Sequence, residues 1–141
     1  MNTIDLLLGI DKGKFEKETK EIKIKSLSKK AERDVIFIVR ELNMDEFKRI
    51  SDLATKKKRH GISETDEVEV AVNTILKSVV DPDFKNEKLL EKYEAETPKE
   101  LVKKILKAGE IMEIYKEIEK VSGFNRDDEE DEKEEEDIKN S

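Results

Sequence analysis

An apolar residue recurs every three or four positions near the end of the chain, and this spacing constrains the fold more than any other feature. The residues are Leu101, Ile105, Ala108, Met112, Tyr115, Ile118 and Val121. An α-helix has 3.6 residues per turn, so this spacing places these side chains along one side of a helix. A helix with one apolar side is stable only when that side is buried. The stretch is therefore predicted to pack against other elements of the chain.

Local signals set the ends of this helical region. Thr97 can cap the first turn, Pro98 suits the first helical position, and Glu100 completes a capping-box pattern. Gly109 interrupts the stripe and can end a helix in a left-handed conformation. We therefore predict two helices with a turn at Gly109, in preference to one continuous helix. A shorter helix is predicted upstream, with Asn86 as its cap.

Two short segments in the first third of the chain have the character of strands. Glu21–Lys25 alternates strictly between charged and apolar residues, which is typical of a half-buried strand. Val35–Val39 is β-branched or aromatic throughout, which indicates a more fully covered strand. The polar connection Ser28–Asp34 makes an antiparallel pair the simplest arrangement. A two-stranded sheet is marginal in water, so either the helices cover it or a third strand joins from another copy.

Two helices are expected between these strands and Pro82. The first begins at Asn43 and ends in the basic segment Lys56–Gly61, where cations suit a helix C-terminus. The second begins at Ser63 and carries an apolar stripe over Val68–Val79. Asp81 and the proline after it are expected to end this helix.

The N-terminus carries a short apolar patch. Thr3 is a plausible cap for a helix that runs to about Leu8, and Gly9 can end it. Leu6, Leu7 and Leu8 give this helix too much apolar surface to remain in water. Docking on the rest of the chain and docking on a second copy both remain open.

The charge distribution divides the chain into a domain and a tail. The sequence has 36 acidic and 29 basic residues, and residues 125–141 hold ten of the former and three of the latter, which leaves 26 of each sign in residues 1–124. A segment this acidic cannot bury enough apolar surface to fold. We predict an α+β domain over residues 1–124, in which a small antiparallel hairpin precedes four to five helices, followed by a disordered acidic tail over residues 125–141.

The composition also limits the classes of function. The chain has no cysteine, no run of apolar residues long enough to span a bilayer, and no secretion signal, so a cytoplasmic protein without a membrane partner is expected. Gly9–Phe15 lacks the spacing and the Ser or Thr of a phosphate-binding loop. Asp81, Asp83 and Asn86 lack the glycine and the closing glutamate of a calcium loop.

Other chemistry is not indicated. The basic segment Lys56–His60 lies in an acidic chain and has no interleaved aromatic residues, so we expect no nucleic-acid partner. His60 is the single histidine, and one histidine makes neither a metal site nor a catalytic pair. We therefore predict no catalytic residues, no cofactor and no bound metal, and a protein that is not an enzyme.

Several short motifs carry a family resemblance. They are Asp81-Pro82-Asp83-Phe84, Leu89, Leu90 and Tyr93, Thr97-Pro98 with Leu101 and Val102, Leu106 with Gly109-Glu110-Ile111, Ser122-Gly123-Phe124, and upstream EIKIKSLSK and VIFIVREL followed by NMDEF. Over about residues 1–124 the chain resembles the XkdN-like phage tail assembly chaperones of prophages and defective prophages with contractile tails. Ala108 departs from the proline that such proteins often have before the Gly-Glu pair, and alanine would let a helix continue through Gly109.

The resemblance implies a helper that is absent from the finished particle. It would hold the tail tape measure protein, a long and mostly helical chain, in solution until tail tube subunits polymerise around it. The tail tube protein is a further candidate partner, a homo-oligomer stays open, and a structural adaptor retained in the tail is the alternative function.

The apolar positions divide into two expected sets. We expect Leu101, Ile105, Met112 and Tyr115 to form the core-facing side of the C-terminal helices. Partner contacts are then expected at the apolar positions that remain, which are Leu6, Leu7, Ile111 and Ile114.

Overall fold

The computed structural model describes residues 1–57 and 61–124. The predicted disordered tail, residues 125–141, lies outside these residues. The elements follow the order α1 Thr3–Leu8, η1 (a 3-10 helix) Lys12–Phe15, β1 Thr19–Lys23, α2 Lys25–Ala31, β2 Ile36–Arg40, α3 Met44–Ala54, β3 Thr55–Lys57, β4 Ser63–Thr65, α4 Glu67–Ser78, β5 Val79–Asp81, α5 Glu87–Lys92, α6 Pro98–Ile105 and α7 Ala108–Val121. The α+β class is confirmed, and five helices follow β2 in the described part of the chain.

The main sheet is antiparallel and has the strand order β1-β2-β5. The predicted pairing of the first two strands is confirmed, with Ile22 opposite Phe37. Their connection was expected to be only polar loop, but it contains α2, which ends at Glu32 in a left-handed conformation. In the central strand Phe37 and Val39 are buried, and Ile36, Ile38 and Arg40, which alternate with them, face the other side of the sheet.

The third strand comes from the same chain and not from another copy. The helical stripe was expected to continue through Val79, but α4 ends at Ser78 and the next three residues pair with β2. Ser78 is fully buried, and its hydroxyl donates to the carbonyl oxygen of Arg40 at 2.7 Å. Pairing of Val79 and Asp81 with β2, next to the Ser78 hydrogen bond, accounts for the early end of the helix, and the β-branched Val79 and Val80 suit this extended backbone.

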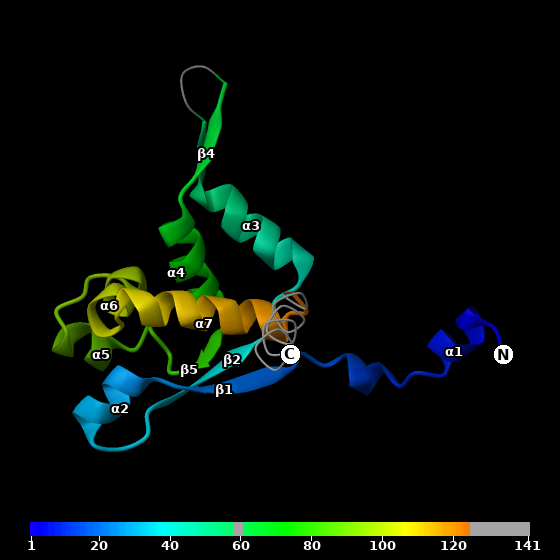
Figure 1. The fold of residues 1–141 in the computed structure, drawn as a ribbon, viewed down its shortest axis with the longest axis horizontal. Coiled ribbons are helices and arrows are strands. Elements are labelled where there is room, and N and C mark those ends of the chain that lie inside the picture. The colour runs from blue at the N-terminus through cyan, green and yellow to red at the C-terminus, as the bar shows by residue number, and fades with distance from the viewer. Residues whose placement is uncertain (58–60, 125–141) are drawn as a thin grey trace, which may run out of the picture.

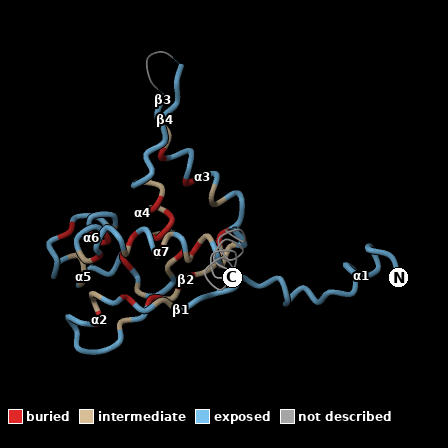
Figure 2. Tube along the Cα trace, viewed as in Figure 1, coloured by how far each residue is buried: buried red, intermediate tan, exposed pale blue. Residues whose placement is uncertain are grey.

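Helices cover one face of this sheet (Figure 1). In that view α7 crosses above β1 and β2, while α4 and α3 rise from it towards the β3–β4 hairpin. The buried side chains concentrate in β2, α4, α6 and α7 (Figure 2). The core side chains with no more than 1% exposure are Val39, Ala71, Val72, Ile75, Leu101, Val102, Ile114 and Ile118.

The C-terminal helical region divides as predicted into two helices, but not at Gly109. The helix α6 ends at Ile105, and Leu106 adopts an extended conformation with its side chain buried. The next helix starts at Ala108, where the Glu110 carboxylate accepts a hydrogen bond from the backbone N–H of Lys107 at 3.0 Å. Gly109 therefore lies inside the first turn of α7. The turn between the two helices is made by Leu106 in an extended conformation with a buried side chain, and not by Gly109 in a left-handed conformation.

The helix caps predicted from Asn43, Asn86 and Thr97 are confirmed, since each side chain accepts a hydrogen bond from the third residue after it. Two other predicted helix starts were wrong by one or more residues. Asn2 caps α1 in place of Thr3, and Asp66 caps α4 in place of Ser63. In both cases an Asn or Asp side chain is available and is at least as good a cap as the hydroxyl.

The predicted end of α3 in the basic segment was also wrong. The helix stops at Ala54, and Thr55–Lys57 pairs with Ser63–Thr65 as a small hairpin. The Thr55 hydroxyl lies 2.9 Å from the Thr65 hydroxyl, which joins the base of the hairpin. Residues 58–60, which include the single histidine, lie outside the described residues.

The Glu46 carboxylate joins three parts of the fold. It accepts hydrogen bonds from the Arg40 guanidinium at 2.7 and 3.2 Å, from Lys17 Nζ at 3.0 Å and from the backbone N–H of Asn43 at 3.2 Å. The Arg40 guanidinium is the main reason that the pKa of Glu46 falls from its ordinary 4.5 to about 2. The charged form of Glu46 therefore ties the end of β2 to the start of α3 and to the residues before β1.

We predict that Ile114→Ala and Met112→Ala differ sharply although both lie in α7. The side chain of Ile114 is 1% exposed and that of Met112 is 43% exposed. Truncation of the buried side chain should lower the free energy of unfolding by about 2–5 kcal/mol, and truncation of Met112 by less than about 1 kcal/mol. Urea denaturation measures both values. Equal effects would contradict the packing of α7 described above.

We also predict that Glu46→Gln lowers stability in a pH-dependent manner. The folded pKa of Glu46 lies below the unfolded pKa, so the charged carboxylate contributes stability that is complete above about pH 4.5 and is lost as the pH falls towards about 2. The variant should lose about 1–3 kcal/mol at neutral pH, and the difference from the wild type should shrink across that range. Urea denaturation at several pH values tests this, with Glu91→Gln as an exposed control. A difference that does not change with pH would contradict the assignment.

Candidate partner-binding site

Residues 1–15 form an N-terminal arm that extends away from the rest of the molecule (Figure 1). The arm contains α1 and η1, and none of its residues is buried. Its two short helices begin at side-chain caps, because Asn2 Oδ1 accepts from the N–H of Asp5 at 2.9 Å and Asp11 Oδ1 accepts from the N–H of Gly13 at 3.0 Å. The arm thus has local order without packing on the domain.

The arm exposes large apolar side chains along its whole length. Leu6 and Leu7, which were predicted to contact a partner, are 56% and 60% exposed. The others are Met1, Ile4, Leu8, Ile10 and Phe15, of which Met1, Leu8 and Phe15 are the most exposed at 99%, 79% and 70%. Clustered apolar exposure of this kind usually marks an interaction surface. Docking of the arm on its own domain was one of the two alternatives left open by the sequence. The structure does not show it, because residues 1–15 are all exposed.

The sequence prediction was incomplete for this arm. It named Leu6, Leu7 and Leu8 as apolar surface that must dock, gave only Leu6 and Leu7 as partner contacts, and missed Ile4, Ile10 and Phe15 as members of the same surface. The composition held a usable signal, since four of the six residues of α1 are large and apolar and Ile10 and Phe15 follow within a few positions. Such a cluster of apolar side chains is typical of an interaction surface.

The other two residues predicted to contact a partner lie in the core of the domain. Ile114 is buried in the core, and Ile111 is only 9% exposed. The turn at Leu106–Lys107 restarts the helix, so the buried side of α7 is Ile111, Ile114 and Ile118. Met112 was expected in the core and points to solvent instead, while Ile105 and Tyr115 are partly buried against the core as expected. These isoleucines are not available to a partner while the domain stays folded.

Backbone and side-chain contacts anchor the base of the arm to the domain. Glu18 and Glu41 exchange two hydrogen bonds, because the N–H of Glu41 donates to the Glu18 carbonyl oxygen and the N–H of Glu18 donates to the Glu41 carboxylate, both at 2.8 Å. Lys17 reaches the Glu46 carboxylate described above. The arm therefore projects from a fixed point at the start of β1.

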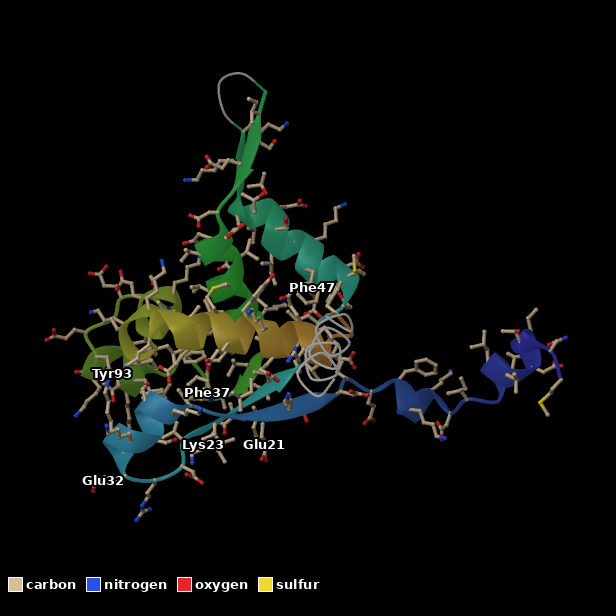
Figure 3. All side chains as sticks on the ribbon, viewed as in Figure 1. Glu21, Lys23, Glu32, Phe37, Phe47 and Tyr93 are labelled. Carbon is tan, nitrogen blue, oxygen red and sulfur yellow. The ribbon has the colours of Figure 1, made fainter. Side chains whose placement is uncertain are left out.

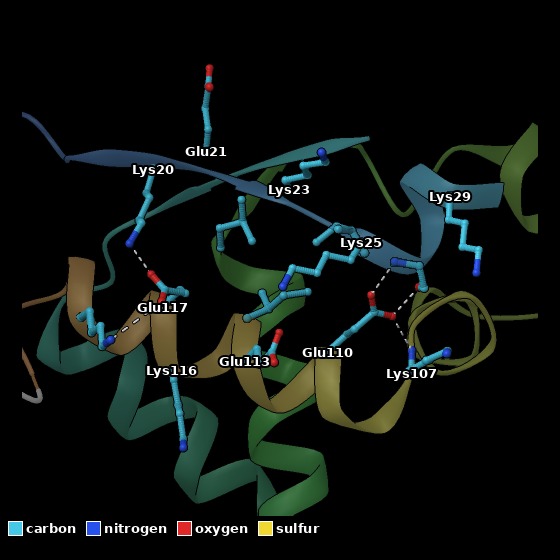
Figure 4. Close-up of a pocket in the computed structure, with 15 residues that line it drawn as sticks. Lys20, Glu21, Lys23, Lys25, Lys29, Lys107, Glu110, Glu113, Lys116 and Glu117 are labelled. Carbon is cyan, nitrogen blue, oxygen red and sulfur yellow. Dashed lines mark hydrogen bonds and ion pairs between the residues drawn. The ribbon is translucent and has the colours of Figure 1, made fainter. Parts of the chain in front are cut away.

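A groove of about 690 Å³ lies between β1 and α7 (Figure 4). Its floor contains Ile22, Ile24 and Ile114, and its walls are charged, with an ion pair between Lys20 and Glu117. At one end the Glu110 carboxylate accepts hydrogen bonds from the Ser26 hydroxyl at 2.6 Å and from the Ser26 N–H at 3.1 Å.

The charge of Glu110 is part of this end of the groove. Burial of its carboxyl group favours the neutral form, but the hydrogen bonds from Ser26 and from the Lys107 N–H outweigh burial and lower the pKa of Glu110. The carboxylate therefore stays ionised and holds α2 against α7.

The described residues contain no group of three or more His, Cys, Asp or Glu side chains placed to hold a metal ion. Gly9–Phe15 forms the end of α1 and the 3-10 helix. Of the basic segment, the structure describes Lys56 and Lys57, which lie on β3 opposite Glu64 and Ser63. In residues 1–57 and 61–124, no helix is long and apolar enough to cross a membrane.

Comparison with known proteins supplies the family. A solved structure described as the crystal structure of the protein YqbN is similar in fold, with a TM-score of 0.56 and 22% sequence identity over 77% of this chain and 88% of that chain. No curated protein matches the sequence. The profile of the family described as phage XkdN-like tail assembly chaperone protein matches residues 4–139, which is nearly the whole chain. The chain therefore belongs to the XkdN-like family of phage tail assembly chaperones.

Proposed function

We propose that this protein is a non-enzymatic chaperone that binds the tail tape measure protein in the host cytoplasm and keeps it soluble during tail assembly. Membership of a tail assembly chaperone family supports a role in phage tail assembly. The tape measure protein is the partner that the family resemblance implies.

The observation that carries this proposal is the exposed apolar surface of the N-terminal arm. A chaperone of this kind must offer apolar side chains to a client that has not yet assembled. Leu6, Leu7, Leu8 and Phe15 are each more than half exposed and make no core contacts. A long helical client presents apolar stripes, and short amphipathic or apolar helices recognise such stripes by side-chain packing. The arm is suited to lie along one of them.

The arm is also positioned for such contacts. Its base is held by the reciprocal hydrogen bonds of Glu18 and Glu41, while its apolar residues lie away from the domain (Figure 1). Binding at the arm therefore does not require the core to open. The partner-binding residues that we propose are Leu6 and Leu7, together with Ile4, Leu8, Ile10 and Phe15.

The charge of the C-terminal segment fits the same role. Residues 125–141 carry a net charge of −7, counted as ten acidic and three basic residues. A strongly acidic segment raises the solubility of the complex that carries it and repels other copies of that complex. The apolar arm would hold the client, and the acidic segment would oppose aggregation.

We predict that co-expression of this chain increases the soluble fraction of the tape measure protein from the same phage or prophage, and that the two proteins co-elute. The double variant Leu6→Asp/Leu7→Asp should abolish most of this effect, because buried charge at an apolar contact is costly. The matched control Lys12→Gln/Lys14→Gln changes the net charge of the arm by the same amount and should retain it. Circular dichroism of each variant checks that the domain is folded.

Three results would count against the proposal or a part of it. If the tape measure protein is equally soluble without this chain, the chaperone function is wrong. If the aspartate variant protects the client as well as the wild type, the function can stand but the arm is not the binding site. Detection of the chain in purified tails would favour a structural adaptor instead.

A further inference from the structure

The strand β1 has an open edge. It pairs with β2 on one side, and no described element pairs with its other side. The N–H of Ile24 donates to the Val35 carbonyl at 2.9 Å, and the N–H of Glu41 donates to the Glu18 carbonyl at 2.8 Å. Hydrogen-bonded pairs alternate in an antiparallel ladder, so the backbone groups of Thr19, Glu21 and Lys23 point away from β2. A row of unpaired backbone groups is a template for another strand.

The side chains at this edge are accessible. Thr19, Glu21 and Lys23 are exposed, and Glu21 and Lys23 point away from the helices (Figures 3 and 4). Lys23 Nζ lies 3.0 Å from Asp34 Oδ1, but both side chains are more than half exposed, so this ion pair is weak. Glu21 forms no hydrogen bond or ion pair with the described residues. Glu21 therefore has no competing contact among the described residues, and Lys23 gives up only a weak ion pair when it meets a partner strand.

We propose that β1 pairs antiparallel with β1 of a second copy of this chain, around a twofold axis at Ile22. This register places Glu21 opposite Lys23 of the second copy, and symmetry repeats the pair. Opposite charges on facing strands attract, and like charges in the same place repel. If the twofold axis lay at Glu21 or at Lys23, that residue would face the same residue of the second copy, and the two like charges would repel. The charge pattern of the strand thus complements a second copy of itself in one register.

The groove beneath this edge fits the same arrangement. Ile22 lies on the α7 side of the sheet, is only partly buried, and lines the groove with Ile24 and Ile114. At the twofold axis the Ile22 side chains of the two copies stand opposite each other, where they cover apolar surface that the single chain leaves open to water. The two three-stranded sheets become one continuous sheet, and the edge of β1 is no longer exposed.

The first test is the oligomeric state of the full chain, measured by sedimentation over a range of concentrations. The wild type should form a dimer in reversible equilibrium. Glu21→Lys and Lys23→Glu should each raise the dissociation constant of the dimer about tenfold. Each variant places like charges opposite each other at both symmetry-related pairs of positions 21 and 23. The double variant Glu21→Lys/Lys23→Glu should restore the dimer. Glu91→Lys, at an exposed position of α5, is a control with the same charge change as Glu21→Lys.

Disulfide trapping is the second test, and it is simple because the chain has no cysteine. In a hydrogen-bonded antiparallel pair the two Cα atoms lie about 5.5 Å apart, which suits a disulfide. A mixture of Glu21→Cys and Lys23→Cys chains should form covalent heterodimers faster than either chain alone forms homodimers. Trapping in this pattern also identifies the register.

The proposal is overturned if the wild type is monomeric at every concentration. It is equally overturned if a dimer forms but neither single charge variant weakens it, or if the double variant fails to restore it. None of these measurements includes a tail protein, so their failure is distinct from failure of the proposed chaperone function.

Discussion

The burial of the central strand β2 is the constraint on which the rest of the structure depends. Phe37 and Val39 point from this strand into a layer of helices, where Phe37 packs edge-to-face on Phe84 at 5.6 Å between ring centroids. A three-stranded sheet of this size is not stable alone, and α4 and α7 supply the apolar surface that it lacks. Ser78 adds a specific link, because its buried hydroxyl is satisfied only when β5 lies beside β2. Helix packing, strand order and the position of β5 follow from this one requirement.

This use of apolar residues determines which surfaces remain for function. The core is supplied almost wholly by residues from Ile24 onwards, and the seven large apolar side chains of the arm take no part in it. The strand β1 likewise lies at the edge of the sheet, with no described element on its outer side. In the proposed dimer, the starts of the two β1 strands lie roughly 20 Å apart, because the twofold at Ile22 offsets them by six residues. The two arms would then leave the dimer at opposite ends, which suits a client that is long and helical.

Local features of the fold were predictable from the sequence, and features that depend on distant contacts were not. The caps at Asn43, Asn86 and Thr97 each involve a residue three positions away, so the pattern contains the whole interaction. The short strand β5 depends on β2, which lies about forty residues earlier, and no local pattern distinguishes it from the end of a helix. The prediction of which side of α7 faces the core was wrong. The turn at Leu106 and Lys107 interrupts the helix, so the apolar spacing of α6 does not continue in register into α7. Met112 and Ile114 exchanged their expected environments for this reason.

Hydrogen exchange of the chain alone and in complex with the tape measure protein would show directly whether the arm holds the client. Backbone amides in an exposed arm exchange quickly, and they slow when the arm packs on a partner. Amides across residues 4–15 should be protected in the complex, with little change in the buried segment of α7 around Ile114. A complex that forms while the arm amides exchange as fast as in the free chain would contradict binding at the arm.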